Sequence, residues 1–266
     1  SPLLLLDLAA QLNTEWAFNA LGHGALDVVH LPGLASATAF NPALLLRKIQ
    51  NIAWLTDSPQ PFAPRTVNKS VHRPCLIAIG ASAGGPATLN QLLHELPADL
   101  DAAVVLIQHL DDKFSAGMAE WLSRESALPV RLVQAGEMPQ PGVVLLAGRN
   151  EHLSVNRQGE LRYTLEPCEQ IYRPSIDVFF RSLAEQWRGD AIGVLLTGMG
   201  SDGARGLKAM RERGFPTITQ DQASSVVWGM PKAAVALGAA DEVLPLDRIS
   251  DRLAELCRWI SVKKTP

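Results

Sequence analysis

Six short apolar runs, separated by helix patterns, dominate the chain from residue 75 onward. The runs are rich in β-branched residues and lie at residues 75–80, 102–108, 129–133, 142–148, 191–198 and 216–220. Most are continuously hydrophobic, which is typical of central strands buried on both faces of a parallel sheet. Helix patterns occupy residues 86–96, 115–125, 176–187 and 202–213. The alternation predicts an α/β fold, a doubly wound and mainly parallel sheet with helices on both faces.

Residues 152–165 have a different pattern. Apolar and polar side chains alternate on either side of Gln158-Gly159. This predicts an antiparallel hairpin at one edge of the sheet. The chain contains no internal repeat of fixed period and no low-complexity tract.

A proline-rich segment divides the chain. Residues 57–74 contain four prolines and little hydrophobic periodicity, so we predict a linker there. Residues 75–266 then form the main domain. Residues 1–56 read as strand, helix, strand and helix, with the elements near 3–6, 16–21, 26–30 and 42–55. This is short for an independent α/β domain and resembles the end of a doubly wound unit.

Composition excludes several classes of protein. Among 266 residues, 47% are hydrophobic and 19% are charged, which is enough apolar material for a core and excludes wholesale disorder. The net charge of −3 argues against a nucleic-acid surface. The three cysteines lie far apart in the sequence, so we expect no disulfide framework and a reduced, cytoplasmic location. No apolar run has the length of a membrane span, and we expect no insertion into a membrane.

Three reactive side chains follow predicted strands. Ser82 follows the run 75–80, His109 follows 102–108, and Asp202 follows 191–198 after a glycine-rich turn. The carboxyl ends of parallel strands meet at one edge of a sheet, where ligands bind. A nucleophile, a base and a carboxylate are therefore predicted on the same edge.

Ser82 lies in Gly80-Ala81-Ser82-Ala83-Gly84-Gly85, which matches the G-x-S-x-G pattern of a nucleophile elbow. The following helix would add N–H groups and the positive end of a dipole. A phosphate-binding loop and a plain small-residue turn remain open as alternatives. A dinucleotide fingerprint requires glycine where Ser82 stands, which weakens the first of these.

His109 and Asp202 each have a structural alternative. A histidine after a strand is often structural, but a serine hydroxyl needs a nearby base before it can attack. Aspartate before a helix is a common N-cap, yet capping alone does not explain Gly198, Gly200 and Gly203 around Asp202. The order Ser, His, Asp excludes the α/β-hydrolase fold without excluding triad chemistry.

We find no metal-binding constellation and no phosphate loop of the G-x-x-x-x-G-K-[ST] type, so neither a metal nor another cofactor is predicted.

Several of these segments together resemble a known family. GASAGG, Gln108-His109, the stretch 173–177 (RPSID), TGMGSDGA and the stretch 229–233 (GMPKA) occur in the same order in chemotaxis-type protein-glutamate methylesterases, the CheB family. The likeness covers essentially all of the main domain. It implies a serine hydrolase that demethylates glutamate methyl esters on the cytoplasmic part of methyl-accepting chemoreceptors and so resets their signalling. Deamidation of glutamine is a further expected activity.

The resemblance also implies roles for individual residues. Ser82 would be the nucleophile, His109 the general base and Asp202 its orienting acid. The amides of Met199 and Ala83 would hold the oxyanion. Family members have threonine where this chain has Ala83, so a hydroxyl is missing there. A further set of motif positions is expected to contact the substrate: Arg173, Ser175 and His152.

Residues 1–56 resemble the end of a flavodoxin-like receiver domain, which precedes the catalytic domain in this family. The phosphoacceptor aspartate would lie upstream, so a histidine kinase would act through a part that this sequence does not contain. The details are more similar to regulators of surface-sensing (Wsp-type) systems than to those of motility. Two other hypotheses are a non-catalytic receptor-binding module of the same fold and a nucleotide-binding oxidoreductase.

Overall fold

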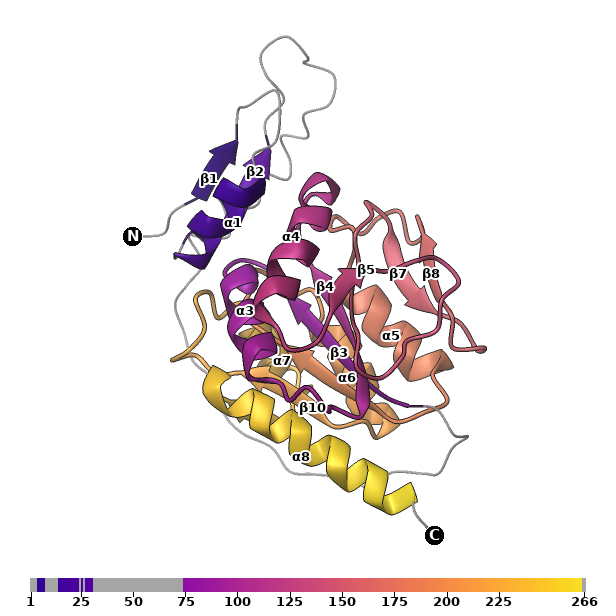
Figure 1. Ribbon diagram of the computed structural model, residues 1–266. Helices are drawn as coiled ribbons and strands as arrows, with labels where there is room; N and C mark the ends of the chain where they lie inside the picture. Colours follow the sequence, from indigo (N-terminus) through magenta and orange to yellow (C-terminus); the bar gives the residue numbers. More distant parts are fainter. Residues whose placement is uncertain (1–3, 8–13, 24, 26, 31–73, 265–266) are drawn as a thin grey trace.

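The computed structural model describes residues 4–7, 14–23, 25, 27–30 and 74–264 (Figure 1). Its central feature is a seven-stranded sheet in which all neighbouring strands are parallel. The strands lie in the spatial order β11 (Glu242–Leu244), β10 (Thr217–Gln220), β9 (Ala191–Leu195), β3 (Cys75–Ala81), β4 (Ala102–Gln108), β6 (Val144–Leu146) and β5 (Val130–Leu132).

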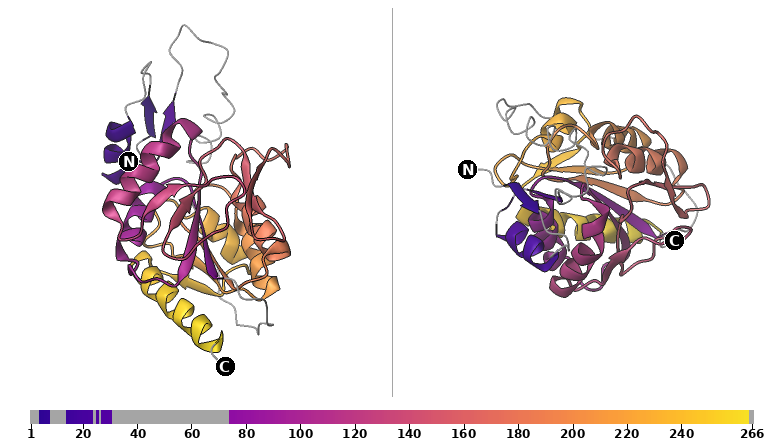
Figure 2. Two further views of the ribbon diagram at one scale, coloured as in Figure 1. Left: turned by 45° about the vertical axis from the view of Figure 1, so that its right-hand side comes forward. Right: turned by 90° about the horizontal axis from the view of Figure 1, so that it is seen from above.

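Helices cover both faces of this sheet (Figure 2). One face is covered by α3 (Gly85–Glu95), α4 (Asp112–Glu125) and α8 (Leu246–Lys264). The other face is covered by α5 (Ile176–Gln186), α6 (Ala204–Arg213) and α7 (Met230–Ala236). The predicted doubly wound α/β fold is confirmed.

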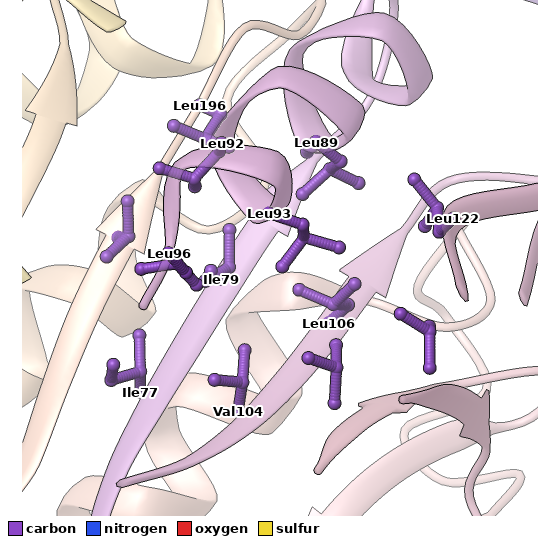
Figure 3. Packing of buried hydrophobic residues seen from close by; sticks show 14 of the residues in the cluster. Ile77, Ile79, Leu89, Leu92, Leu93, Leu96, Val104, Leu106, Leu122 and Leu196 are labelled. Atoms are coloured by element: carbon purple, nitrogen blue, oxygen red, sulfur yellow. The ribbon is translucent and has the colours of Figure 1, made fainter. Parts of the chain in front are cut away.

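The central strands contribute to two hydrophobic cores. Along β3, Ile77 and Ile79 belong to the core under α3, α4 and α8, whereas Leu76 and Ala78 belong to the core on the opposite face. Figure 3 shows the first core, where leucines of α3 lie over β3 and β4. These strand residues are fully buried, and each large aliphatic side chain stabilises the fold by about 1.5–3 kcal/mol. The carboxyl ends of the strands are therefore fixed from both sides.

The predicted hairpin forms, but it is not part of the seven-stranded sheet. β7 (His152–Val155) and β8 (Leu161–Thr164) pair antiparallel as a separate two-stranded sheet, with Gly159 at a φ of +89° in the turn. Leu153, Val155 and Leu161 are buried in the core beside α5. The hairpin is thus attached through side-chain packing, because its inner face covers α5 instead of extending a sheet edge.

The N-terminal residues contain β1 (Leu4–Asp7), α1 (Thr14–Gly22) and β2 (Asp27–His30), and β1 and β2 pair in parallel. Helix α1 lies against α3 and α4 (Figure 1). The predicted helix at 42–55 and residues 57–73 of the predicted linker lie outside the described residues. The three-part division of the chain stays a prediction.

Several element boundaries differ from expectation. The run predicted over 142–148 forms a strand only at β6 (Val144–Leu146), and the helix predicted over 115–125 begins earlier, at Asp112. The strand predicted over 191–198 ends at Leu195, because the Thr197 N–H donates to the Gln220 side chain (2.8 Å) instead of continuing the ladder. The predicted elements end at residue 220, whereas the structure adds α7, β11 and α8. Helix α8 covers part of one face of the sheet, so it is needed to close that core.

Candidate active site

The carboxyl ends of three adjacent strands form the site. In the register of β3 with β4, Ala81 pairs with Gln108, so Ser82 and His109 follow directly paired residues. β9 lies on the other side of β3 and leads into the loop 196–203. The strand order thus brings together the three loops that carry the predicted nucleophile, base and carboxylate.

Ser82, His109 and Asp202 form one chain of hydrogen bonds. His109 Nδ1 lies 3.1 Å from Ser82 Oγ, and His109 Nε2 lies 2.8 Å from Asp202 Oδ2. The carboxylate accepts the Nε2 proton, which leaves the lone pair of Nδ1 for the serine hydroxyl proton. Ser82 and His109 are 5% and 4% exposed. The two ring nitrogens have the opposite partners to those in the chymotrypsin triad, but the chemical relations are the same.

Asp202 is held by the first turn of α5. Its carboxylate accepts hydrogen bonds from the Ser175 hydroxyl (2.8 Å) and from the Ile176 and Asp177 backbone amides (2.7 and 3.1 Å). Burial alone raises the pKa of Asp202, but the hydrogen bond and charge of His109 and these amides outweigh it. The pKa of this carboxyl therefore lies below its usual value. Asp202 stays ionised and fixed in orientation.

The predicted oxyanion donors lie beside Ser82. Ala83 and Met199 form a small buried cluster with Val227. Among the described residues, neither the Ala83 nor the Met199 amide donates a hydrogen bond, whereas the Ser82 amide donates to the Thr197 carbonyl (3.0 Å). Two unused N–H groups next to a nucleophile are the arrangement that an oxyanion site requires.

Gly198 allows the loop after β9 to approach the nucleophile. A Cβ at this position would lie 2.8 Å from the Ser82 Cβ and would also meet the Met230 side chain. Gly200 and Gly203 have φ values of +84° and +89°, which favour glycine. The three glycines around Asp202 thus have a steric and conformational cause.

Ser175 and His152 lie behind Asp202. Both side chains are fully buried. His152 Nδ1 accepts the Ser175 N–H (3.1 Å), so Nε2 carries the proton and donates to the Pro167 carbonyl (3.2 Å). Burial lowers the pKa of His152, which keeps the ring neutral. These contacts give both residues a supporting position, and their predicted contact with substrate stays a prediction.

Arg173 lies on the segment before α5. Its Nη2 donates to the Cys168 carbonyl (3.0 Å). The Arg173 Nε is buried, and no described residue accepts a hydrogen bond from it. The predicted contact of Arg173 with the substrate stays a prediction.

Three further residues shape the site, and sequence reasoning did not assign them a role. Gln108 Nε2 donates to the Ser82 and His109 carbonyls (2.9 and 3.2 Å), which joins the nucleophile and base loops. The Thr197 hydroxyl lies 3.0 Å from the Ala83 carbonyl and accepts the Val227 N–H (2.9 Å). The Tyr172 ring stacks on His109. Gln108 and Thr197 lie within the quoted motifs, and Tyr172 directly precedes the stretch 173–177, but no pattern in the sequence predicts these contacts.

The described residues contain neither a metal-binding cluster nor a membrane-spanning helix. Within these residues, no group of three or more His, Cys, Asp or Glu side chains is arranged to hold a metal ion. No helix in the described part of the chain is long and apolar enough to cross a membrane.

Comparison with known proteins identifies relatives of most of the chain. Residues 77–253 match the family described as CheB methylesterase. The chain is 58% identical over 250 residues to protein-glutamate methylesterase/protein-glutamine glutaminase 2 of Cupriavidus metallidurans, which covers 92% of this chain and 73% of that protein. It is 55% identical over 258 residues to protein-glutamate methylesterase/protein-glutamine glutaminase 3 of Pseudomonas aeruginosa, covering 96% of this chain and 77% of that protein.

A solved structure gives the same result for the fold. The catalytic domain of the Thermotoga maritima CheB methylesterase superposes with a TM-score of 0.64 at 34% sequence identity. The match covers 71% of this chain and all of that domain. The family match spans more than half of the chain and includes the motifs around Ser82, His109 and Asp202. The chain therefore belongs to the CheB methylesterase family.

Proposed function

We propose that this protein is a protein-glutamate methylesterase that hydrolyses glutamate methyl esters on the cytoplasmic part of chemoreceptors. The observation that carries the proposal is the hydrogen-bonded chain of Ser82, His109 and Asp202 at the carboxyl ends of the strands. The relatives at 55–58% identity have the same named activity. Neither the geometry nor the relatives support the non-catalytic alternative, and family membership argues against a nucleotide-binding oxidoreductase.

The geometry supports a two-step acyl transfer. Ser82 Oγ attacks the ester carbonyl while His109 Nδ1 takes the hydroxyl proton, and Asp202 stabilises the resulting imidazolium. The amides of Ala83 and Met199 hold the negative oxygen of the tetrahedral intermediate. His109 then returns the proton to the leaving oxygen, and methanol departs. Water attacks the acyl-enzyme in the same way and releases a glutamate carboxylate.

The same site supports deamidation of glutamine. An amide passes through the same tetrahedral intermediate, and His109 would protonate the leaving nitrogen so that ammonia departs. The names of the relatives include a protein-glutamine glutaminase. Each of the two reactions yields a negative charge on the receptor, so we expect both to change its signalling state through electrostatics.

The biological setting is part of the proposal. The receptor is the expected partner, and a histidine kinase is the expected source of regulation. Both the enzyme and the substrate portion of the receptor would lie in the cytoplasm. The Wsp-type surface-sensing pathway remains a prediction from the sequence.

The decisive experiment replaces the nucleophile. We expect Ser82→Ala to abolish methanol release from a methylated receptor, because no other hydroxyl is bonded to His109 Nδ1 among the described residues. Ser154→Ala is the matched control, since its hydroxyl donates to the Arg162 carbonyl within the hairpin and has no other partner among the described residues. Ser82 should also react with a serine-directed phosphonate, and His109→Ala should abolish that labelling. Full esterase activity in Ser82→Ala would overturn the assignment.

A further inference from the structure

Tyr172 covers one face of the general base. Its ring lies parallel to the His109 ring, with 4.1 Å between ring centroids and 4° between ring planes. Tyr172 is half-buried, whereas its neighbour Ile171 is 54% exposed. Neither residue is needed for the chemistry described above, so this contact is unexplained by the proposed mechanism.

The stacked Tyr172 ring restrains a tilt of the His109 ring that the two hydrogen bonds of His109 do not prevent. His109 is held in its ring plane through Nδ1 to Ser82 and through Nε2 to Asp202. Rotation of the ring about the line that joins the two partner atoms, Ser82 Oγ and Asp202 Oδ2, leaves both distances unchanged, so these bonds alone do not prevent it. An aromatic ring packed flat on the imidazole resists this tilt directly. Catalysis is sensitive to such misplacement, because small errors in the position of a reacting group lower the rate strongly.

The segment that carries Tyr172 is fixed on both sides. Before it, the Pro167 carbonyl accepts from His152 and the Cys168 carbonyl accepts from Arg173. After it, Ser175 bonds Asp202. Contacts within the protein therefore hold Tyr172 in position before the substrate binds, and substrate binding does not have to order it.

The aromatic face also suits the charge that develops on the base. When His109 takes the Ser82 proton it becomes a cation, and the face of a tyrosine ring attracts a cation. On these grounds we infer that Tyr172 is a positioning residue, which holds the His109 ring between Ser82 and Asp202 and favours the imidazolium of the transition state. The inference rests on the proposed esterase function of this site.

The test distinguishes the effect of the Tyr172 aromatic ring from the effect of its hydroxyl group. Tyr172→Leu keeps an apolar side chain but has no aromatic face, whereas Tyr172→Phe keeps the face. We expect Tyr172→Leu to lower kcat for methanol release about 10-fold, with KM within about twofold, and Tyr172→Phe to stay within about twofold of the unsubstituted protein. Tyr163→Leu is the matched control, because Tyr163 bonds the Gly148 amide outside the site.

A second measurement does not need the receptor. The rate of Ser82 labelling by a serine-directed phosphonate should fall in Tyr172→Leu by the same factor as kcat, and not in Tyr172→Phe or Tyr163→Leu. An effect confined to KM would overturn the inference, because it would make Tyr172 a substrate contact. An equal loss in Tyr172→Phe would also overturn it. If the protein labels normally but releases no methanol, the proposed function fails while the labelling series still decides the role of Tyr172.

Discussion

At the scale of single residues, the geometry of the site depends on the hydrogen bonds that both carboxylate oxygens of Asp202 accept. Its two oxygens accept from His109, Ser175 and two backbone amides. These bonds keep the carboxylate ionised against the effect of burial, which by itself raises its pKa. The aspartate can therefore both fix the tautomer of His109 and stabilise the imidazolium during proton transfer.

Asp202→Asn tests this role. The amide keeps the shape of the side chain but removes the charge and no longer dictates the Nε2–H tautomer. We expect kcat for methanol release to fall about 10⁴-fold, as for the corresponding change in chymotrypsin-type triads. Asp251→Asn on the exposed face of α8 should leave kcat unchanged. Substantial activity in Asp202→Asn would show that another group orients His109.

Gly198→Ala tests the close approach of the loop to Ser82. The added Cβ would lie 2.8 Å from the Ser82 Cβ, so one of the two loops must move. We expect a destabilisation of about 1–3 kcal/mol and a loss of kcat of about 10²-fold, measured by chemical denaturation and methanol release. Gly22→Ala is the control, since the one described residue within 4 Å of its Cβ would be Trp121, at an ordinary 3.6 Å. Normal kcat in Gly198→Ala would mean that this contact does not position the nucleophile.

At the scale of elements, His152 connects β7 to the start of α5. The ring accepts from the Ser175 amide and donates to the Pro167 carbonyl, so it bonds both ends of the segment that carries Tyr172. Ser175 in turn caps α5 by accepting from the Val178 amide (3.4 Å) and donates to Asp202. The hairpin, the segment and the helix are thus joined by a few buried polar contacts behind the triad.

The neutral state of His152 predicts a pH dependence of stability. Burial lowers its pKa in the folded protein below the ordinary value of 6.5, so the unfolded chain binds the proton more readily. This contribution to stability is complete above about pH 6.5 and is lost as the pH falls below it.

The melting temperature between pH 7.5 and pH 5 measures this effect. We expect the melting temperature of His152→Gln to decrease less over that pH range than the melting temperature of the unsubstituted protein, whatever the absolute stability of the variant. Ser154→Ala, which removes no titratable group, serves as the control and should leave the decrease unchanged. Parallel curves for His152→Gln and the unsubstituted protein would contradict the prediction.

At the scale of the whole molecule, the N-terminal residues share a core with the catalytic part. Phe18 of α1 is 1% exposed and lies edge-on to Phe114 (6.5 Å between centroids) and stacked on Trp121 (5.8 Å). Both partners belong to α4, which begins three residues after His109. Helix α1 therefore adds to the core beneath α3 and α4 instead of standing apart from it.

Phe18→Ala tests this packing. Loss of a fully buried phenylalanine is expected to lower the free energy of unfolding by about 3–5 kcal/mol, measured by chemical denaturation. Trp16→Ala on the same helix is the control, because Trp16 is 55% exposed and its loss should cost much less. A change below about 1 kcal/mol in Phe18→Ala would contradict the packing of α1 on α4.

Much of the fold follows from local patterns in the sequence. The runs that became β3 and β4 are apolar throughout because they are buried on both faces, and their observed ends differ from the predicted ones by at most one residue. No element is predicted after residue 220, although Leu246, Ile249 and Leu253 repeat at helical spacing and lie in the core. The sequence predicts the hairpin as an element but does not predict that it packs on α5, because packing partners leave no local signature.

The sequence by itself determined which loops carry Ser82, His109 and Asp202, since side chains that follow parallel strands must emerge at one edge of the sheet. Only the tertiary structure decided which ring nitrogen faces which partner, that α5 supports Asp202, and that Tyr172 covers His109. The physical reason is the distance along the chain between the residues that interact. Periodicity is fixed by neighbours along the chain, whereas these contacts join residues far apart in sequence and depend on how helices pack on the sheet.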